Sequence, residues 1–277
     1  MDNRKIGVFD SGLGGLTVVR EMENILPEEN VIYFGDTARV PYGSKSKSTI
    51  IEFSHQIMRF LLGHEIKAVI IACGTASSNA LEELKEAYDL PIIGVVEPGA
   101  HLAVRTTKNG RIGVLGTAAT IRSGAFERVI HKADPQLDVV SQPCPLFVPL
   151  AEEGWFSDEI TRQIIRRYIA PVKEAGVDTV ILGCTHYPLL RDLIQEEMGE
   201  GVSLINVSEA ATREMGEYLK AHDMSAVEEP DPLDPSSIKK GRYEFFASDS
   251  IDQFRSFSKQ ILDLSEVCVS RINIERY

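Results

Sequence analysis

Two cysteines stand at matched positions of an internal repeat in the amino-acid sequence. Cys73 ends the mostly apolar run 67–72, and Cys184 ends the similar run 178–183. Inversion of a carbon centre needs two acid/base groups, because one removes a proton from one face and the other returns a proton to the opposite face. A single base would tend to restore the starting enantiomer. The cysteine pair therefore predicts a proton transfer that inverts a carbon centre.

Polar side chains end several other apolar runs in the same way. They are Asp10, Ser11, Asp36, Thr75, Thr117, Thr120, Thr185 and His186. Ligands of open parallel sheets bind outside the carboxyl ends of the strands, so we expect these residues beside the cysteines. Cysteine reacts as the thiolate, and the ordinary pKa of its thiol is about 8.5. Asp10 and His186 are therefore candidates to tune the thiols and relay protons, and the hydroxyl groups are candidates to hold substrate carboxylates.

A cysteine at the end of one buried strand is ordinarily a small packing residue. Cys73 and Cys184 differ because they match in the repeat, and Thr or His follows each within two residues. Cys144 lies between two prolines and Cys268 lies in a helical pattern, so both are interpreted as packing residues. Among the four cysteines, a catalytic function is therefore assigned only to Cys73 and Cys184.

The sequence predicts neither a metal nor a nucleotide cofactor. The spacing of Cys73, Cys184 and His186 fits none of the usual structural zinc motifs. The stretch 12–15 resembles the start of a dinucleotide loop, but the third glycine of that fingerprint is replaced by Thr17. We expect a tight turn whose helix amides face a carboxylate instead.

Short apolar runs alternate with longer helical patterns along most of the chain. Runs that are apolar throughout are typical of buried parallel strands. A helix is predicted between Ser48, as its cap, and Gly63. The alternation predicts α/β architecture with right-handed crossovers. The predicted strands are 6–9, 31–34, 68–72, 92–96, 112–115, 139–141, 179–182 and 203–207.

The repeat also predicts the domain organisation. Residues 5–11 resemble 111–117, just as the two cysteine runs resemble each other. We expect two pseudo-symmetric α/β domains with parallel sheets and the active site in the cleft between them. The predicted first domain is residues 1–97 plus 209–277, and the second is residues 98–208.

The tail after the repeat is predicted to pack back on the first domain. An acidic, proline-marked stretch at 228–235 indicates an exposed connection. A strand at 243–247 and a terminal helix from 251 to 274 are expected to follow it.

Composition excludes several classes of protein. The 277-residue chain has a formal net charge of −12, which argues against neutralisation of nucleic-acid phosphates. The longest strongly apolar run is 68–73, far short of the ~20 residues that a membrane helix needs. The charged start of the chain has no apolar signal core. We expect a cytoplasmic protein with reduced thiols, no nucleic-acid partner and no membrane partner.

Four stretches together resemble bacterial glutamate racemase, of the aspartate/glutamate racemase family. They are Gly7–Thr17, Tyr33–Thr37, Pro41–Gly43 and Leu182–Pro188. The resemblance implies two pseudo-symmetric α/β domains, a homodimer and racemisation of glutamate without a cofactor. It also implies that the product, D-glutamate, is used for peptidoglycan biosynthesis. The enzyme would thereby contribute to cell-wall biogenesis and cell shape.

The resemblance also implies roles for individual residues. Cys73 and Cys184 would be the catalytic pair, acting on D-glutamate and L-glutamate respectively. Asp10 and His186 would assist them, as would Glu152. The implied substrate contacts are Asp10, Ser11, Tyr42, Gly43, Gly74, Thr75, Thr185 and His186, with Thr117 and Thr120 as further contributors.

One position departs from the family pattern. The family has Asn after the first cysteine, whereas this chain has Gly74, which has no side chain to bind substrate. Loss of a hydrogen bond to a charged group costs about 1.5–3 kcal/mol, or a ten- to hundredfold effect. The Gly74 amide, a water molecule or Asn79 would have to compensate.

Three alternatives therefore stay open. The protein could racemise aspartate or another small acidic amino acid. It could be a weakly active or non-catalytic binding protein, because Gly74 replaces the usual Asn. It could also be a thiol-redox protein, in which Cys73 and Cys184 form a reversible disulfide.

Overall fold

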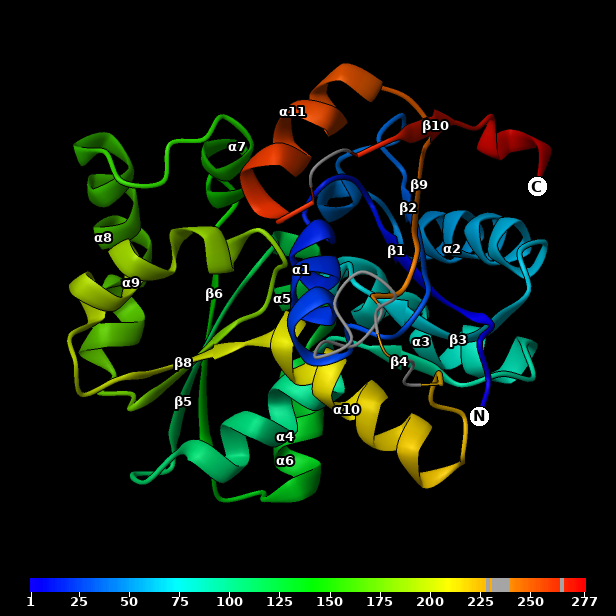
Figure 1. Ribbon diagram of the computed structural model, residues 1–277. Helices are drawn as coiled ribbons and strands as arrows, with labels where there is room; N and C mark the ends of the chain where they lie inside the picture. Colours follow the sequence, from blue (N-terminus) through cyan, green and yellow to red (C-terminus); the bar gives the residue numbers. More distant parts are fainter. Residues whose placement is uncertain (228–229, 231–239, 265–266) are drawn as a thin grey trace.

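The computed structural model describes residues 1–227, 230, 240–264 and 267–277. These residues form two parallel β-sheets with helices packed around each of them (Figure 1). Within these ranges, no helix has both the length and the apolar character needed to span a bilayer. The α/β fold with two parallel sheets confirms the predicted fold class.

The first sheet combines strands from both ends of the chain. Its order is β10-β9-β2-β1-β3-β4, and every neighbouring pair is parallel. β9 pairs with β2 along its whole length, so the tail lies in the same sheet as the start of the chain (Figure 1). The strands are β1 (Lys5–Asp10), β2 (Val31–Gly35), β3 (Ile66–Ile71), β4 (Ile92–Gly94), β9 (Tyr243–Ala247) and β10 (Val269–Arg271).

The second sheet repeats the inner part of the first. Its order is β6-β5-β7-β8, which matches β2-β1-β3-β4, and all of its pairs are parallel. β5 therefore corresponds to β1, and β7 corresponds to β3, as the sequence repeat predicts. The strands are β5 (Arg111–Gly116), β6 (Asp138–Pro143), β7 (Thr179–Leu182) and β8 (Ser203–Asn206).

Helices connect the parallel strands in both halves. α10 packs against α1 from the first half and α4 from the second, which ties the two sheets together (Figure 1). The helices are α1 (Leu16–Ile25), α2 (Lys47–Leu62), α3 (Gly74–Ala87), α4 (Val96–Thr106), α5 (Ala118–Ser123), α6 (Ala125–Ala133), α7 (Phe147–Glu152), α8 (Glu159–Glu174), α9 (Arg191–Met198), α10 (Val207–Ala221) and α11 (Ile251–Ile261). Short 3₁₀ turns cover Tyr42–Ser44, Tyr187–Leu190 and Ile274–Arg276.

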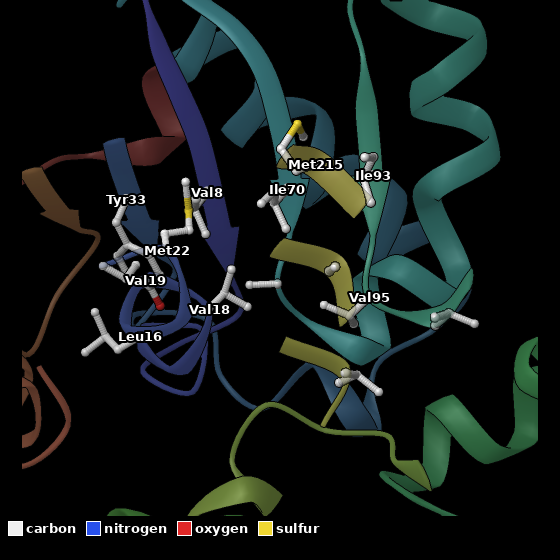
Figure 2. Packing of buried hydrophobic residues seen from close by; sticks show 14 of the residues in the cluster. Val8, Leu16, Val18, Val19, Met22, Tyr33, Ile70, Ile93, Val95 and Met215 are labelled. Carbon is white, nitrogen blue, oxygen red and sulfur yellow. The ribbon is translucent and has the colours of Figure 1, made fainter. Parts of the chain in front are cut away.

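Apolar side chains on both faces of the inner strands explain why these runs are apolar throughout. Every residue of β2, β3 and β7 is buried. Val8 of β1 and Ile70 of β3 lie in one cluster with Val18 of α1 and Met215 of α10 (Figure 2). Each fully buried apolar side chain of this size contributes about 1.5–3 kcal/mol relative to an exposed one. Burial on both faces therefore fixes the strands that carry the site.

The tail departs from its predicted structure. α11 ends at Ile261, and the chain then forms β10 instead of continuing as a helix to residue 274. Val269 is buried against the first sheet as part of this edge strand, so the apolar positions serve a sheet and not a helix face. Cys268 is exposed and lies outside any helix, so its predicted packing role in a helix is wrong.

Two smaller differences concern the ends of elements. The strand predicted at 92–96 ends at Gly94, because Val96 already begins α4. Ser46, and not Ser48, caps α2 by accepting a hydrogen bond from the Thr49 amide; Gly63 ends this helix as predicted. The predicted connection at 228–235 lies outside the described residues, apart from Pro230.

Candidate active site

A cavity of about 450 Å³ lies between the two sheets, at the carboxyl ends of their strands. It is lined by residues at, or just after, the carboxyl ends of strands in both sheets, as expected for ligand sites in parallel sheets. All the predicted catalytic and substrate residues line it, namely Asp10, Ser11, Tyr42, Gly43, Cys73, Gly74, Thr75, Cys184, Thr185 and His186. Thr117 and Glu152 line it as well.

Cys73 occupies the junction between β3 and α3. It caps α3, and its sulfur accepts a hydrogen bond from the Ala76 amide at 3.4 Å. Its thiol donates to the Ser11 hydroxyl at 3.3 Å. Burial and the nearby Asp10 carboxylate raise the pKa of Cys73 to about 12, although its hydrogen bonds with Ser11 and Ala76 oppose this rise. At neutral pH Cys73 is therefore a thiol that can donate a proton.

Cys184 follows β7 at the equivalent place in the second sheet. The Nδ1 atom of His186 lies 3.8 Å from the Cys184 sulfur, and Nε2 lies 3.0 Å from Oε1 of Glu152. Burial lowers the pKa of His186, but its hydrogen bonds to Cys184 and Glu152 outweigh this and raise the pKa to about 10. His186 is therefore an imidazolium at neutral pH, and it offers a positive partner to a Cys184 thiolate.

Asp10 connects the surroundings of the two cysteines. It is almost fully buried at the end of β1 and accepts a hydrogen bond from the Gly12 amide at 2.8 Å. Burial raises the pKa of Asp10, while the positive charge of His186 and backbone amides act against that rise. Its charge acts on both Cys73 and His186. Asp10 can therefore couple proton movements on the two sides of the cavity.

The glycine-rich turn after β1 lets the first sheet approach the second. A Cβ atom on Gly14 would overlap the ring of His186 and come within 2.7 Å of the Thr185 hydroxyl. The Thr17 hydroxyl donates to the backbone carbonyl of Thr185 at 3.0 Å. The turn therefore supports the Cys184 side of the cavity by close packing, and Thr185 is held beside it.

Three threonine hydroxyls form a cluster across the cleft. Oγ1 of Thr75, at the start of α3, lies 2.9 Å from Oγ1 of Thr117. Thr117 caps α5 and also lies 3.0 Å from the hydroxyl of Thr120. Thr120 is buried behind the other two and is absent from the cavity lining. Such hydroxyls, close to the helix amides, suit a carboxylate.

The buried carboxylate of Asp36 fixes the position of Tyr42, which forms part of the cavity wall (the Tyr42 wall). Asp36 is fully buried and accepts hydrogen bonds from the Tyr42 hydroxyl, from Nε of Arg39 at 2.7 Å and from the Ser248 hydroxyl at 2.9 Å. Ser248 also accepts a hydrogen bond from the Ala38 amide at 2.8 Å. Asp36 therefore lies outside the cavity, and the tail supports the Tyr42 wall through Ser248.

Sequence reasoning missed Ser248 and the apolar walls of the cavity. The missed wall residues include Val40, Pro145 and Val148. A serine after β9 and isolated apolar residues outside the strands carry no distinguishing pattern, so no sequence signal identifies them.

Asn79 does not replace the missing side chain at Gly74. Its amide nitrogen donates to the Thr75 carbonyl at 2.8 Å and to the Ser78 hydroxyl at 3.0 Å. Its side chain borders a separate surface groove and not the cavity. The compensation by Asn79 suggested at the sequence level is therefore wrong.

The thiols and acidic groups of the described ranges do not form a metal site. No group of three or more His, Cys, Asp and Glu side chains within these ranges is placed to hold a metal ion. All the cysteines are free thiols.

Comparisons with known proteins agree with this geometry. The family model for Asp/Glu/Hydantoin racemase matches residues 6–215. A glutamate racemase from Geobacter metallireducens is 47% identical over 246 residues, 89% of this chain and 88% of the relative.

Solved structures agree as well. A crystal structure of glutamate racemase from Bacillus anthracis has a TM-score of 0.91 and 35% identity, with 98% of each chain covered. One from Francisella tularensis, in complex with D-glutamate, has a TM-score of 0.89 and 37% identity, with 100% of each chain covered.

The fold and these relatives identify a racemase, an enzyme of the isomerase class. The chain belongs to the Asp/Glu/Hydantoin racemase family.

Proposed function

We propose that this enzyme interconverts L-glutamate and D-glutamate by proton transfer between Cys73 and Cys184. The observation that carries the proposal is the placement of two thiols, from equivalent strands of two matching sheets, on one cavity with different acid/base partners. Its relatives are named glutamate racemases and cover nearly the whole chain, which supports glutamate over aspartate.

In the proposed reaction, one proton leaves one face of the α-carbon and one proton is added to the opposite face. With L-glutamate, the Cys184 thiolate removes the α-proton, and the bond electrons stay on the α-carbon. The Cys73 thiol then donates its proton to the opposite face, which leaves Cys184 as a thiol and Cys73 as a thiolate. The reverse transfer converts D-glutamate. The raised pKa of Cys73 and the imidazolium beside Cys184 suit the starting state for L-glutamate.

The carboxylates of the substrate have matching donors in the cavity. We assign them to the Ser11 hydroxyl, the cluster of Thr75 and Thr117, and backbone amides of the turns at Gly43 and Thr185. These contacts would place the α-carbon between the two sulfur atoms. Orientation of this kind contributes strongly to the rate of a proton transfer.

Several wider features belong to the same proposal. The enzyme would need no cofactor, would act in the cytoplasm as a homodimer, and would supply D-glutamate for peptidoglycan. Its domains would be residues 1–97 plus 209–277 and residues 98–208. The support for these features is the family membership and the matched strand order of the two sheets.

An optical assay tests the proposal. Purified protein under reducing conditions, without added cofactor, is incubated separately with L-glutamate, D-glutamate and L-aspartate, and circular dichroism of the amino acid is followed. We expect the signal to decay to zero from either enantiomer of glutamate, since the two have equal free energy. Faster conversion of aspartate would favour the aspartate alternative. No conversion of either, with glutamate still binding, would favour a binding protein. Activity that needs oxidised thiols would favour the redox alternative.

A further inference from the structure

Gly74 lies where the two segments that carry the cysteines contact each other. It is buried at the first turn of α3 and faces Gly183, at the end of β7 in the other sheet. A Cβ atom on Gly74 would overlap the backbone carbonyl oxygen of Gly183 and lie 3.7 Å from the Thr120 hydroxyl. The two backbones therefore pack together only because residue 74 has no side chain.

The Gly183 carbonyl cannot easily move out of the way. The Gly183 amide donates to the Leu115 carbonyl of β5 at 2.8 Å. A Cβ atom on Gly183 would itself lie 2.8 Å from that carbonyl oxygen and 2.9 Å from the ring of Phe126. The segment is therefore enclosed by backbone and a buried ring. Interiors packed at this density transmit strain instead of absorbing it.

Gly74 is similarly fixed on its own side. It begins α3, whose first turn includes the hydrogen bond from the Ser77 amide to the Cys73 carbonyl at 2.8 Å. A side chain at position 74 would thus have to separate α3 from β7. Each contacting glycine is covalently next to one of the cysteines, so such a separation moves the sulfur atoms apart.

The threonine cluster depends on the same approach. Thr75 and Thr117 come from opposite sides of the cleft, and their hydroxyls lie 2.9 Å apart beside the glycine contact. Moving α3 away from the second sheet would break this pair as well.

We propose that Gly74 is a positioning residue that sets the separation of Cys73 and Cys184 through backbone contact with Gly183. The inference rests on the proposed function. In this interpretation Gly74 positions the two cysteines, whereas in the other interpretation Gly74 is only the loss of an Asn side chain that would bind substrate. The two interpretations of this glycine predict opposite effects for the same substitution.

Two variants and one control separate the interpretations. Gly74→Ala adds only the Cβ atom, and Gly74→Asn adds an amide that can hydrogen-bond substrate. Gly201→Ala is the matched control, because an added Cβ atom there meets no heavy atom within 4 Å. A misplacement of about 1 Å can lower a rate by about a hundredfold. We expect kcat of Gly74→Ala to fall about ten- to hundredfold with KM changed less, Gly74→Asn to fall at least as far, and the control to match the wild type.

Either of two kinetic results would overturn the proposal. Gly74→Ala with wild-type kcat would show that the contact does not set the geometry. Gly74→Asn with raised kcat/KM would make the glycine a lost ligand. A Gly74→Ala chain that fails to fold, as judged by far-ultraviolet circular dichroism, would also overturn it, since the glycine would then be a requirement of the fold.

A cross-linking measurement does not depend on turnover. A short reagent that alkylates two thiols is added to the wild type and to Gly74→Ala, and the joined peptides are identified by mass spectrometry. We expect the Cys73–Cys184 cross-link to form more slowly in the variant, and equal rates would contradict the proposal. If the wild type fails to racemise glutamate but the cross-linking rates differ, the proposed function fails and the spacing role stands.

Discussion

The Glu152→Gln substitution gives a quantitative test of the acid/base assignment on the Cys184 side. The substitution keeps the shape of the side chain but removes the negative charge 3.0 Å from Nε2 of His186. His186, whose pKa is raised to about 10, is expected to lose much of the stabilisation of its protonated form. Glu153→Gln is the matched control, because its exposed side chain is the next along the chain and does not line the cavity.

The size of the effect follows from one charged hydrogen bond. Such a bond is worth about 1.5–3 kcal/mol. One pKa unit corresponds to about 1.4 kcal/mol, so the pKa of His186 should fall by about one to two units. If the imidazolium is the active form, activity is present below this pKa and is lost as the pH rises through it. The alkaline limb of kcat/KM should therefore move from near pH 10 to about pH 8–9.

The assay is circular dichroism of glutamate between pH 6 and pH 11, started from each enantiomer. The titration of the substrate itself is the same for every variant, so a displaced limb reports on the enzyme. Because the enantiomers have equal free energy, kcat/KM must fall equally in both directions. An alkaline limb that stays in place in Glu152→Gln, or moves to higher pH, would refute the role of the Glu152–His186 pair.

Two further substitutions test a support of the site and a buried ion pair at the first sheet. Ser248→Ala removes the tail hydroxyl that donates to the Asp36 carboxylate. A lost hydrogen bond to a charged group, about 1.5–3 kcal/mol, should raise KM by up to about ten- to hundredfold with kcat changed less, and Ser248→Thr should restore it. A larger loss of kcat than of affinity would contradict positioning of the Tyr42 wall. Lys67→Met leaves Glu29 buried without its charged partner at 2.6 Å. Urea unfolding should show a loss of about 3–5 kcal/mol, partly recovered with Glu29→Gln added, since the carbonyls of Asp2 and Met224 also lose the Lys67 ammonium. Wild-type stability of the single variant would exclude this account.

Much of the fold follows from apolar runs that are buried on both faces. Residues 68–71 and 180–182 lie in strands because nothing in these runs suits an exposed surface. The tail differs because a short edge strand has few residues to show a pattern. Val269 and Ile274 are both buried, and their spacing alone does not distinguish a helix from a strand followed by a turn.

Some residues of the site can likewise be predicted from the sequence, and others cannot. The internal repeat is enough to pair Cys73 with Cys184, since equivalent strands end at equivalent places. Ser248 could not be predicted, because its partner Asp36 is 212 residues away and the two meet only through the pairing of β9 with β2. The sequence presents Gly74 as an absent ligand, whereas its backbone contact exists only once the two sheets are assembled.

The most direct test of the central claim uses Cys73→Ala and Cys184→Ala in deuterated water, with Cys268→Ala as an exposed-thiol control. Each variant is given L-glutamate and D-glutamate separately, and both α-deuterium incorporation and optical inversion are measured. We expect both variants to lose racemisation while the control keeps it. Any exchange that remains should be confined to D-glutamate in Cys184→Ala and to L-glutamate in Cys73→Ala. Racemisation at the wild-type rate by either variant, or exchange of the same enantiomer by both, would contradict two-cysteine catalysis.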